Sequence, residues 1–122
     1  MAKPYYEFFC PVKVIAGNAA LEHIPFELAT LGAKRPLIIT DKGVRANGLL
    51  NPIEAAFSTT DAVIGHVFDD VPPDSSLEVV RLAAEAYRTN KCDAIIAVGG
   101  GSVIDTSKAT NILVSEGGDD LL

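Results

Sequence analysis

The 122-residue sequence has two cysteines, two histidines, one methionine and no tryptophan, and it has no excess of basic residues. The two cysteines, Cys10 and Cys92, make no disulfide framework and indicate a reducing, cytoplasmic compartment. Ten basic and sixteen acidic residues give a net charge of −6. This argues against nucleic acid or an anionic membrane as the main partner, because both require a basic patch. No apolar run approaches a membrane span, and residues 1–7 contain no apolar signal core.

The composition is that of a folded domain, with 48% hydrophobic and 21% charged residues. Strand and helix signals alternate along it. The predicted strands cover residues 11–16, 36–40, 62–68 and 94–98. The predicted helices cover residues 19–31, 51–58, 75–89 and 102–115, with an irregular helical turn over 43–48. This order predicts an α/β fold, a Rossmann-like, doubly wound and mainly parallel sheet with helices on both faces.

Several helix ends are predicted from single residues. Ser75 and Glu78 have the spacing of a capping box at the start of the third long helix. Asn51 is predicted to cap the second, with Pro52 at its first helical position. Gly32 is predicted to follow the end of the first.

Three polar segments follow predicted strands: Asp41 with Gly43, the loop 69–76, and the turn 99–102. In parallel sheets, ligands bind at the carboxyl ends of the strands. We therefore expect these three segments to meet at one edge of the sheet.

The turn after the last strand carries the most informative pattern, AIIAVGGGSVID over residues 94–105. Its glycines, Gly99, Gly100 and Gly101, permit a close approach of the backbone to a ligand. The helix that follows presents free N–H groups and the positive end of its dipole. This combination favours phosphate, and the alternative is a glycine turn needed only for tight strand–helix packing.

Two side chains of this turn are candidate ligand contacts. Ser102 is expected either to cap the helix or to bind a phosphate oxygen. Asp105 is expected to complete a capping box or to contact a neutral polar group of a ligand, since a carboxylate is an awkward neighbour for phosphate.

The turn is not the usual dinucleotide fingerprint, because Ile104 stands where the last glycine or alanine would be and the order differs: the acid of the fingerprint lies about 20 residues after the glycines. The candidate acid, Asp41, comes long before the glycines, at the end of a buried strand. There a carboxylate accepts hydrogen bonds from a ribose diol and repels a 2′-phosphate, which favours NAD over NADP. The alternative interpretation of Asp41 is a turn or helix cap before Gly43.

Four segments resemble the N-terminal part of the iron-containing (group III) alcohol dehydrogenases: FCPVKVIAG (9–17), LIITDKG (37–43), FDDVPP (68–73) and CDAIIAVGGGSVIDTSK (92–108). Their order and spacing agree along essentially the whole chain. The resemblance implies an NAD(P)-dependent enzyme that interconverts alcohols with aldehydes or ketones. Residues 1–122 would then be its nucleotide-binding domain, incomplete at the C-terminus.

The resemblance also implies roles for single residues. Asp41 would contact the adenosine ribose, and Asp105 would lie near the nicotinamide end. Asp74 stands where the family usually has an asparagine that contacts the cofactor. The pyrophosphate would be held by Gly99, Gly100, Gly101 and Ser102.

Members of this family bind iron or zinc (Fe²⁺ or Zn²⁺) through one aspartate and three histidines in a helical C-terminal domain. The two histidines here, His23 and His66, match no ligand motif, and we interpret both as surface or satisfied core groups. The chain is therefore predicted to bind no metal itself, to contain no catalytic residue, and to be inactive alone.

Two alternatives stay open. The chain could belong to a relative with the same fold: glycerol or glycerol-1-phosphate dehydrogenase, maleylacetate reductase or dehydroquinate synthase. It could also be a non-catalytic nucleotide-binding or assembly module. The aromatic stretch Tyr5–Phe9 is a candidate edge strand that pairs with a second subunit, which would make the protein a homodimer or a higher homo-oligomer.

Overall fold

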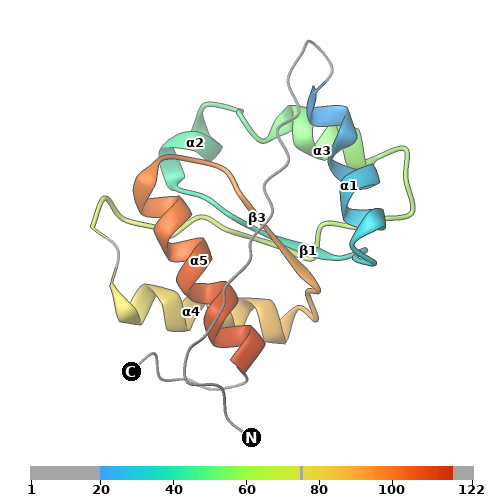
Figure 1. The fold of residues 1–122 in the computed structure, drawn as a ribbon. Coiled ribbons are helices and arrows are strands. Elements are labelled where there is room, and N and C mark those ends of the chain that lie inside the picture. The colour runs from blue at the N-terminus through green and yellow to red at the C-terminus, as the bar shows by residue number, and fades with distance from the viewer. Residues whose placement is uncertain (1–19, 75, 117–122) are drawn as a thin grey trace, which may run out of the picture.

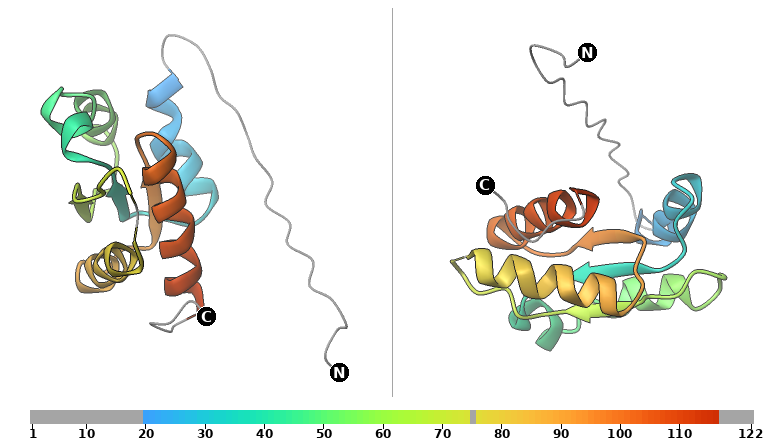
Figure 2. Two further views of the ribbon diagram at one scale, coloured as in Figure 1. Left: turned by 90° about the vertical axis from the view of Figure 1, so that its left-hand side faces the viewer. Right: turned by 90° about the horizontal axis from the view of Figure 1, so that it is seen from below.

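The computed structural model describes residues 20–74 and 76–116, and Figures 1 and 2 show a small sheet between helices. In chain order the elements are η1 (Ala20–His23), α1 (Ile24–Thr30), β1 (Pro36–Ile39), α2 (Lys42–Ala46), α3 (Asn51–Phe57), β2 (His66–Phe68), α4 (Leu77–Thr89), β3 (Ala94–Ala97) and α5 (Gly101–Glu116). Within these residues no helix combines the length and the hydrophobicity that crossing a membrane requires.

The three strands are parallel and lie in the order β2-β1-β3. In the register, Ile38 lies between Val67 of β2 and Ile96 of β3. The chain thus leaves β1 toward one neighbour and later crosses to the other side of β1. Strand order reverses at β1, and such a reversal opens a crevice at the carboxyl ends of the strands.

Helices cover both faces of the sheet. Successive residues of a strand point to opposite faces, so β1 contributes apolar side chains to a cluster on each face. Leu37 and Ile39 of β1 belong to a buried cluster with Ala83 of α4 and Val103 of α5. Ile38 belongs to the opposite cluster, with residues of α1 and α3. In Figure 1, β1 and β3 run between these two groups of helices. The predicted α/β fold with a parallel, doubly wound sheet is confirmed.

Backbone geometry explains both ends of the first helix. The predicted helix 19–31 is divided into η1 and α1, and a proline (Pro25) stands in the first turn of α1. Gly32, at φ +75°, follows the helix end as predicted. The amides of Gly32 and Ala33 donate to the carbonyls of Ala29 and Leu28, which satisfies two terminal carbonyls of the helix.

Two predicted helix caps are wrong by one residue. Helix α4 is capped by Ser76, whose hydroxyl accepts from the Val79 amide at 3.3 Å. The predicted cap, Ser75, is one residue earlier and lies outside the described residues. Helix α3 includes Asn51 and is preceded by Leu50. Leu50 is 2% exposed, so burial of its side chain fixes where the chain enters the helix.

The strand predicted over residues 62–68 is shorter than expected. Residues 62–65 run beside the segment that enters β1, where the amides of Val63 and Gly65 donate to the carbonyls of Lys34 and Pro36. Regular pairing is confined to His66–Phe68.

Cys92 is buried in the core. Burial is also the main reason that the pKa of its thiol is raised. The predictions for residues 1–19, which are the strand 11–16 and the pairing of Tyr5–Phe9, lie outside the described residues.

Candidate functional site

A pocket of about 650 Å³ lies at the carboxyl ends of the strands, within the range of roughly 300–1,000 Å³ that is typical of small-molecule sites. Segments that follow all three strands form its wall, as expected from the sequence. The lining residues are Asp41, Lys42, Gly43, Asp69, Asp70, Val71, Pro72, Pro73, Gly100, Gly101, Ser102 and Val103.

Thr40 joins the ends of the three strands. Its amide donates to the carbonyl of Phe68 at 2.9 Å, and its hydroxyl donates to the carbonyl of Val98 at 2.6 Å. The side chain is fully buried. Thr40 therefore fixes where the next residue, Asp41, enters the pocket; sequence reasoning treated Thr40 only as the end of a strand.

Asp41 caps helix α2. Its Oδ1 accepts a hydrogen bond from the Val44 amide at 2.7 Å. This confirms the capping interpretation without deciding against ligand contact, because the carboxylate has a second oxygen and its residue lines the pocket. Gly43 keeps the turn compact, since a Cβ there would lie 3.3 Å from the same Oδ1.

The three glycines after β3 differ in what surrounds them. Gly99 has φ +154°, and a Cβ on it would lie 2.7 Å from Cγ2 of Val103, so this glycine serves strand–helix packing. Gly100 and Gly101 line the pocket, and among the described residues, apart from chain neighbours and the backbone of α5, no atom lies within 4 Å of a Cβ placed on either. Packing against Val103 therefore explains why residue 99 is a glycine, whereas Gly100 and Gly101 border open space.

Helix α5 starts at Gly101, one residue earlier than predicted, and is 16 residues long. Its first i→i−4 bond runs from the amide of Ile104 to the carbonyl of Gly100 at 3.0 Å. The amides before Ile104 have no partner within the helix, and they carry the positive end of its dipole toward the pocket. The hydroxyl of Ser102 donates to the carbonyl of Pro73, which ties the loop after β2 to this helix end.

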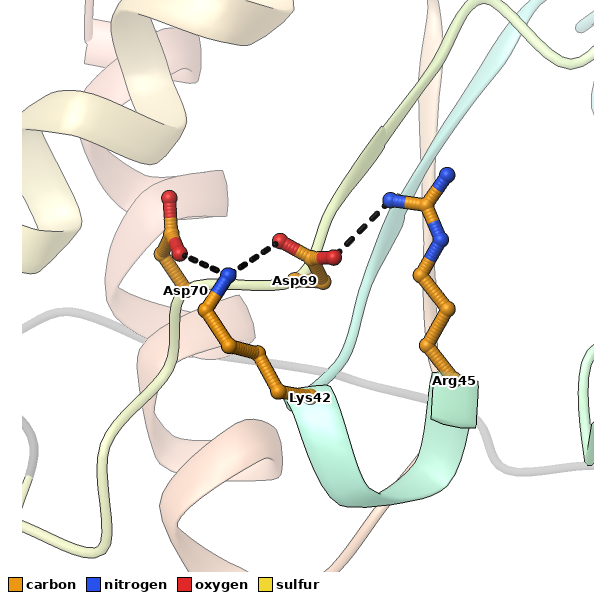
Figure 3. A network of polar contacts seen from close by, with 4 residues as sticks. All are labelled: Lys42, Arg45, Asp69 and Asp70. Carbon is orange, nitrogen blue, oxygen red and sulfur yellow. Dashed lines mark hydrogen bonds and ion pairs between the residues drawn. The ribbon is translucent and has the colours of Figure 1, made fainter. Parts of the chain in front are cut away.

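A network of four charged side chains crosses the pocket rim (Figure 3). Lys42 Nζ lies 2.7 Å from Oδ1 of Asp70 and 3.3 Å from Oδ1 of Asp69, and Arg45 Nη1 lies 2.9 Å from Oδ2 of Asp69. The network joins α2 to the loop after β2. Sequence reasoning missed it, although the pair Asp69-Asp70 directly after a strand is a visible signal.

The network shifts two pKa values in the directions expected for ion pairs. The hydrogen bond from Arg45 is the largest cause that lowers the pKa of Asp69, with partial burial acting against it. The hydrogen bonds to Asp70 and then to Asp69 raise the pKa of Lys42. Both shifts favour the charged forms of Lys42 and Asp69.

Three of the predicted contacts, Gly99, Asp74 and Asp105, do not line the pocket. Asp74 follows the lining prolines and Asp105 lies in the second turn of α5, and both are exposed. Their roles as cofactor contacts stay predictions.

His23 and His66 are exposed and lie on different elements, η1 and β2. In the part of the chain that the structure describes, no three side chains of His, Cys, Asp or Glu come together as a metal site.

This chain is similar in sequence and in fold to known proteins. The family model described as "Iron-containing alcohol dehydrogenase" matches residues 11–122. The 4-hydroxybutyrate dehydrogenase of Cupriavidus necator is 38% identical over 100 residues, covering 82% of this chain and 25% of the relative. The NAD-dependent methanol dehydrogenase of Bacillus methanolicus is 29% identical over 111 residues, covering 91% and 29%.

Among solved structures, an iron-containing alcohol dehydrogenase from Thermotoga maritima matches with a TM-score of 0.74 and 34% identity, over 96% of this chain and 32% of that one. The chain thus spans about a quarter to a third of the length of these relatives.

Proposed function

The chain belongs to the iron-containing alcohol dehydrogenase family, and we propose that it forms the NAD-binding part of a dehydrogenase that acts on an alcohol and its aldehyde or ketone. The observation that carries the proposal is the open pair Gly100 and Gly101 at the N-terminus of α5, inside the pocket at the reversal of strand order. Backbone amides at such a helix end bind phosphate groups.

The pocket fits the parts of NAD in a definite order. The pyrophosphate lies against Gly100 and Gly101, where no side chain intervenes and the amides of the first turn are available. The adenosine ribose lies against Asp41, whose Oδ2 accepts from a ribose hydroxyl while Oδ1 keeps its bond to Val44. A carboxylate at this position disfavours a 2′-phosphate, so the proposed cofactor is NAD.

When bound, the nicotinamide ring supplies the hydride chemistry. The residues of this chain hold and orient the nucleotide: Thr40 fixes the end of β1, and Ser102 holds the loop after β2 against α5. We propose no metal-binding role for the described residues, because they assemble no ligand set.

The kind of alcohol is left open. The two curated relatives are named for 4-hydroxybutyrate and methanol, which differ in size and charge. Both names are consistent with an oxidoreductase that acts on a CH–OH group.

Isothermal titration calorimetry of NAD against the purified protein tests the proposal. We expect binding that Gly100→Glu weakens at least about tenfold, because the substitution places a side chain and a negative charge where the pyrophosphate would lie. Ala55→Glu adds the same charge on an exposed position of α3 and is expected to leave the affinity unchanged. Equal NAD affinity in Gly100→Glu and the wild type would contradict the proposed site.

A further inference from the structure

Two cations stand directly beyond Asp41. Lys42 and Arg45 are the first and fourth residues of α2, and Lys42 lines the pocket. In dinucleotide sites an arginine near the position of the ribose-binding acid accommodates the 2′-phosphate of NADP. By position alone, these two cations would favour NADP and oppose the preference that Asp41 imposes.

Both cations form ion pairs with carboxylates of the loop after β2. Asp69 contacts Lys42 through one oxygen and Arg45 through the other, and Asp70 contacts Lys42 at 2.7 Å. Figure 3 shows Lys42 and Arg45 reaching from the same helix to opposite sides of the Asp69 carboxylate. The two positive and two negative charges of this network cancel, so Lys42 and Arg45 do not offset the negative charge of Asp41.

We propose that Asp69 and Asp70 are specificity-determining residues, which exclude a 2′-phosphorylated nucleotide by holding Lys42 and Arg45 away from it. The inference rests on the proposed NAD site and concerns which nucleotide that site rejects.

A 2′-phosphate would meet two unfavourable changes. To recruit Lys42 it would have to break the contacts of this side chain with both carboxylates. It would then lie close to Asp69 and Asp70 as well as Asp41, and like charges at short range are repulsive. A ribose 2′-hydroxyl meets neither difficulty, because it needs only an acceptor such as Asp41.

Asp69 is the more important of the two acids. Its side chain is 21% exposed, against 60% for Asp70, and it holds both cations. Partial burial reduces screening by solvent and salt. We therefore expect a larger effect from replacing Asp69 than from replacing Asp70.

The test measures equilibrium binding of ADP-ribose and 2′-phospho-ADP-ribose by calorimetry, with no turnover required. In Asp69→Asn we expect affinity for the 2′-phosphorylated ligand to rise roughly fivefold, and affinity for ADP-ribose to change less than about twofold. Asp70→Asn should give a smaller rise in the same direction. Asp61→Asn removes an exposed carboxylate from the segment that enters β2, at the opposite end of this strand from the pocket loop, and should change neither affinity.

A third variant separates released cations from simple loss of negative charge. When Lys42→Gln and Arg45→Gln are added to Asp69→Asn, most of the gain for the 2′-phosphorylated ligand should disappear, leaving only the part due to the lost repulsion by Asp69. If the whole gain persists without the cations, repulsion by Asp69 alone explains it and the proposal is overturned.

The remaining outcomes are also decisive. If the wild type binds ADP-ribose but Asp69→Asn leaves the ratio of the two affinities unchanged, the proposed function stands and this inference fails. If the wild type binds neither ligand, both fail together. Circular dichroism of each variant verifies that the fold is retained.

Discussion

Gly99 and Gly100 are neighbours in the chain, yet they lack a side chain for different physical reasons. Gly99 adopts a positive φ and packs against the side chain of Val103, whereas Gly100 borders open space in the pocket. The first glycine is therefore needed for folding, and the second is free to serve a ligand.

This difference predicts that the same small substitution affects stability at Gly99 and NAD binding at Gly100. Gly99→Ala should lower the free energy of unfolding by about 1–3 kcal/mol, because the added methyl group overlaps Val103 and the backbone is strained. Gly100→Ala should change it by less than about 0.5 kcal/mol and should weaken NAD binding. Urea unfolding and NAD titration of both variants check this, and equal stability losses would contradict the assignment.

Asp41 has two separable roles, as a helix cap and as a carboxylate in the pocket. Asp41→Ala should cost about 1 kcal/mol of stability, because the Val44 amide loses its acceptor. Asp41→Asn keeps a capping oxygen and should cost little stability while reducing the preference for NAD over NADP. Thermal unfolding measures the first role and nucleotide titration the second. If Asn is as destabilising as Ala, the cap does not account for the stability loss.

At the scale of elements, the short helix α2 depends on its neighbours. It is five residues long, well below the length at which an isolated helix is stable in water. The Asp41 cap stabilises its start, and the ion pairs of Lys42 and Arg45 attach it to the loop after β2. The pocket rim is thus one connected unit built from α2 and the loop after β2.

The attachment should depend on pH. The pKa of Asp69 in the folded chain is lowered, chiefly by Arg45, from its ordinary value of 3.8. A depressed pKa contributes stability that is present above the unfolded value and is lost as the pH falls through the folded value. Asp69→Asn should therefore be less stable than the wild type at pH 7, by about 0.5–1 kcal/mol, and the difference should shrink below about pH 4.

Urea unfolding of the two proteins at a series of pH values measures this difference. Asp61→Asn serves as the control for loss of one exposed carboxylate. A difference that stays constant down to the acid limit would show that the ion pairs do not stabilise the rim.

At the scale of the whole molecule, the parallel sheet brings together segments that are far apart in the chain. Residues 41–43, 69–73 and 100–103 meet at one edge because every strand of the described sheet points the same way. The opposite edge is held separately: Asp93 accepts from the amides of Lys34 and Arg35, both at 2.8 Å.

Binding of NAD should change amide hydrogen exchange at one edge of the sheet and not at the other. We expect NAD to slow amide hydrogen exchange in all three pocket segments, because the ligand bridges them and adds its binding free energy to their closed state. Exchange at residues 34–35 and 90–93 should change little. Protection of a single segment, measured by mass spectrometry, would show that the three do not form one site.

Local patterns in the sequence determined much of this organisation. The apolar runs around Ile38 and Ile96 specified buried strands, and their alternation with helical periods specified the parallel sheet. The direction of those strands then placed the pocket, because equivalent ends of parallel strands share an edge. Helix ends were less predictable: Leu50, buried in the core, fixes the start of α3 although it is no capping residue.

The tertiary structure decided what each residue of the site contacts. Three consecutive glycines look alike in the sequence, and only the position of Val103 separates Gly99 from the others. The pairing of Lys42 and Arg45 with Asp69 spans more than twenty positions along the chain. The hydrophobic periodicity of a sequence indicates which face of a helix or strand a residue occupies. Packing partners and ion pairs depend instead on how separate segments approach one another in space. The sequence thus determined the fold and the edge of the sheet where the site lies, and the fold determined the site's charge balance.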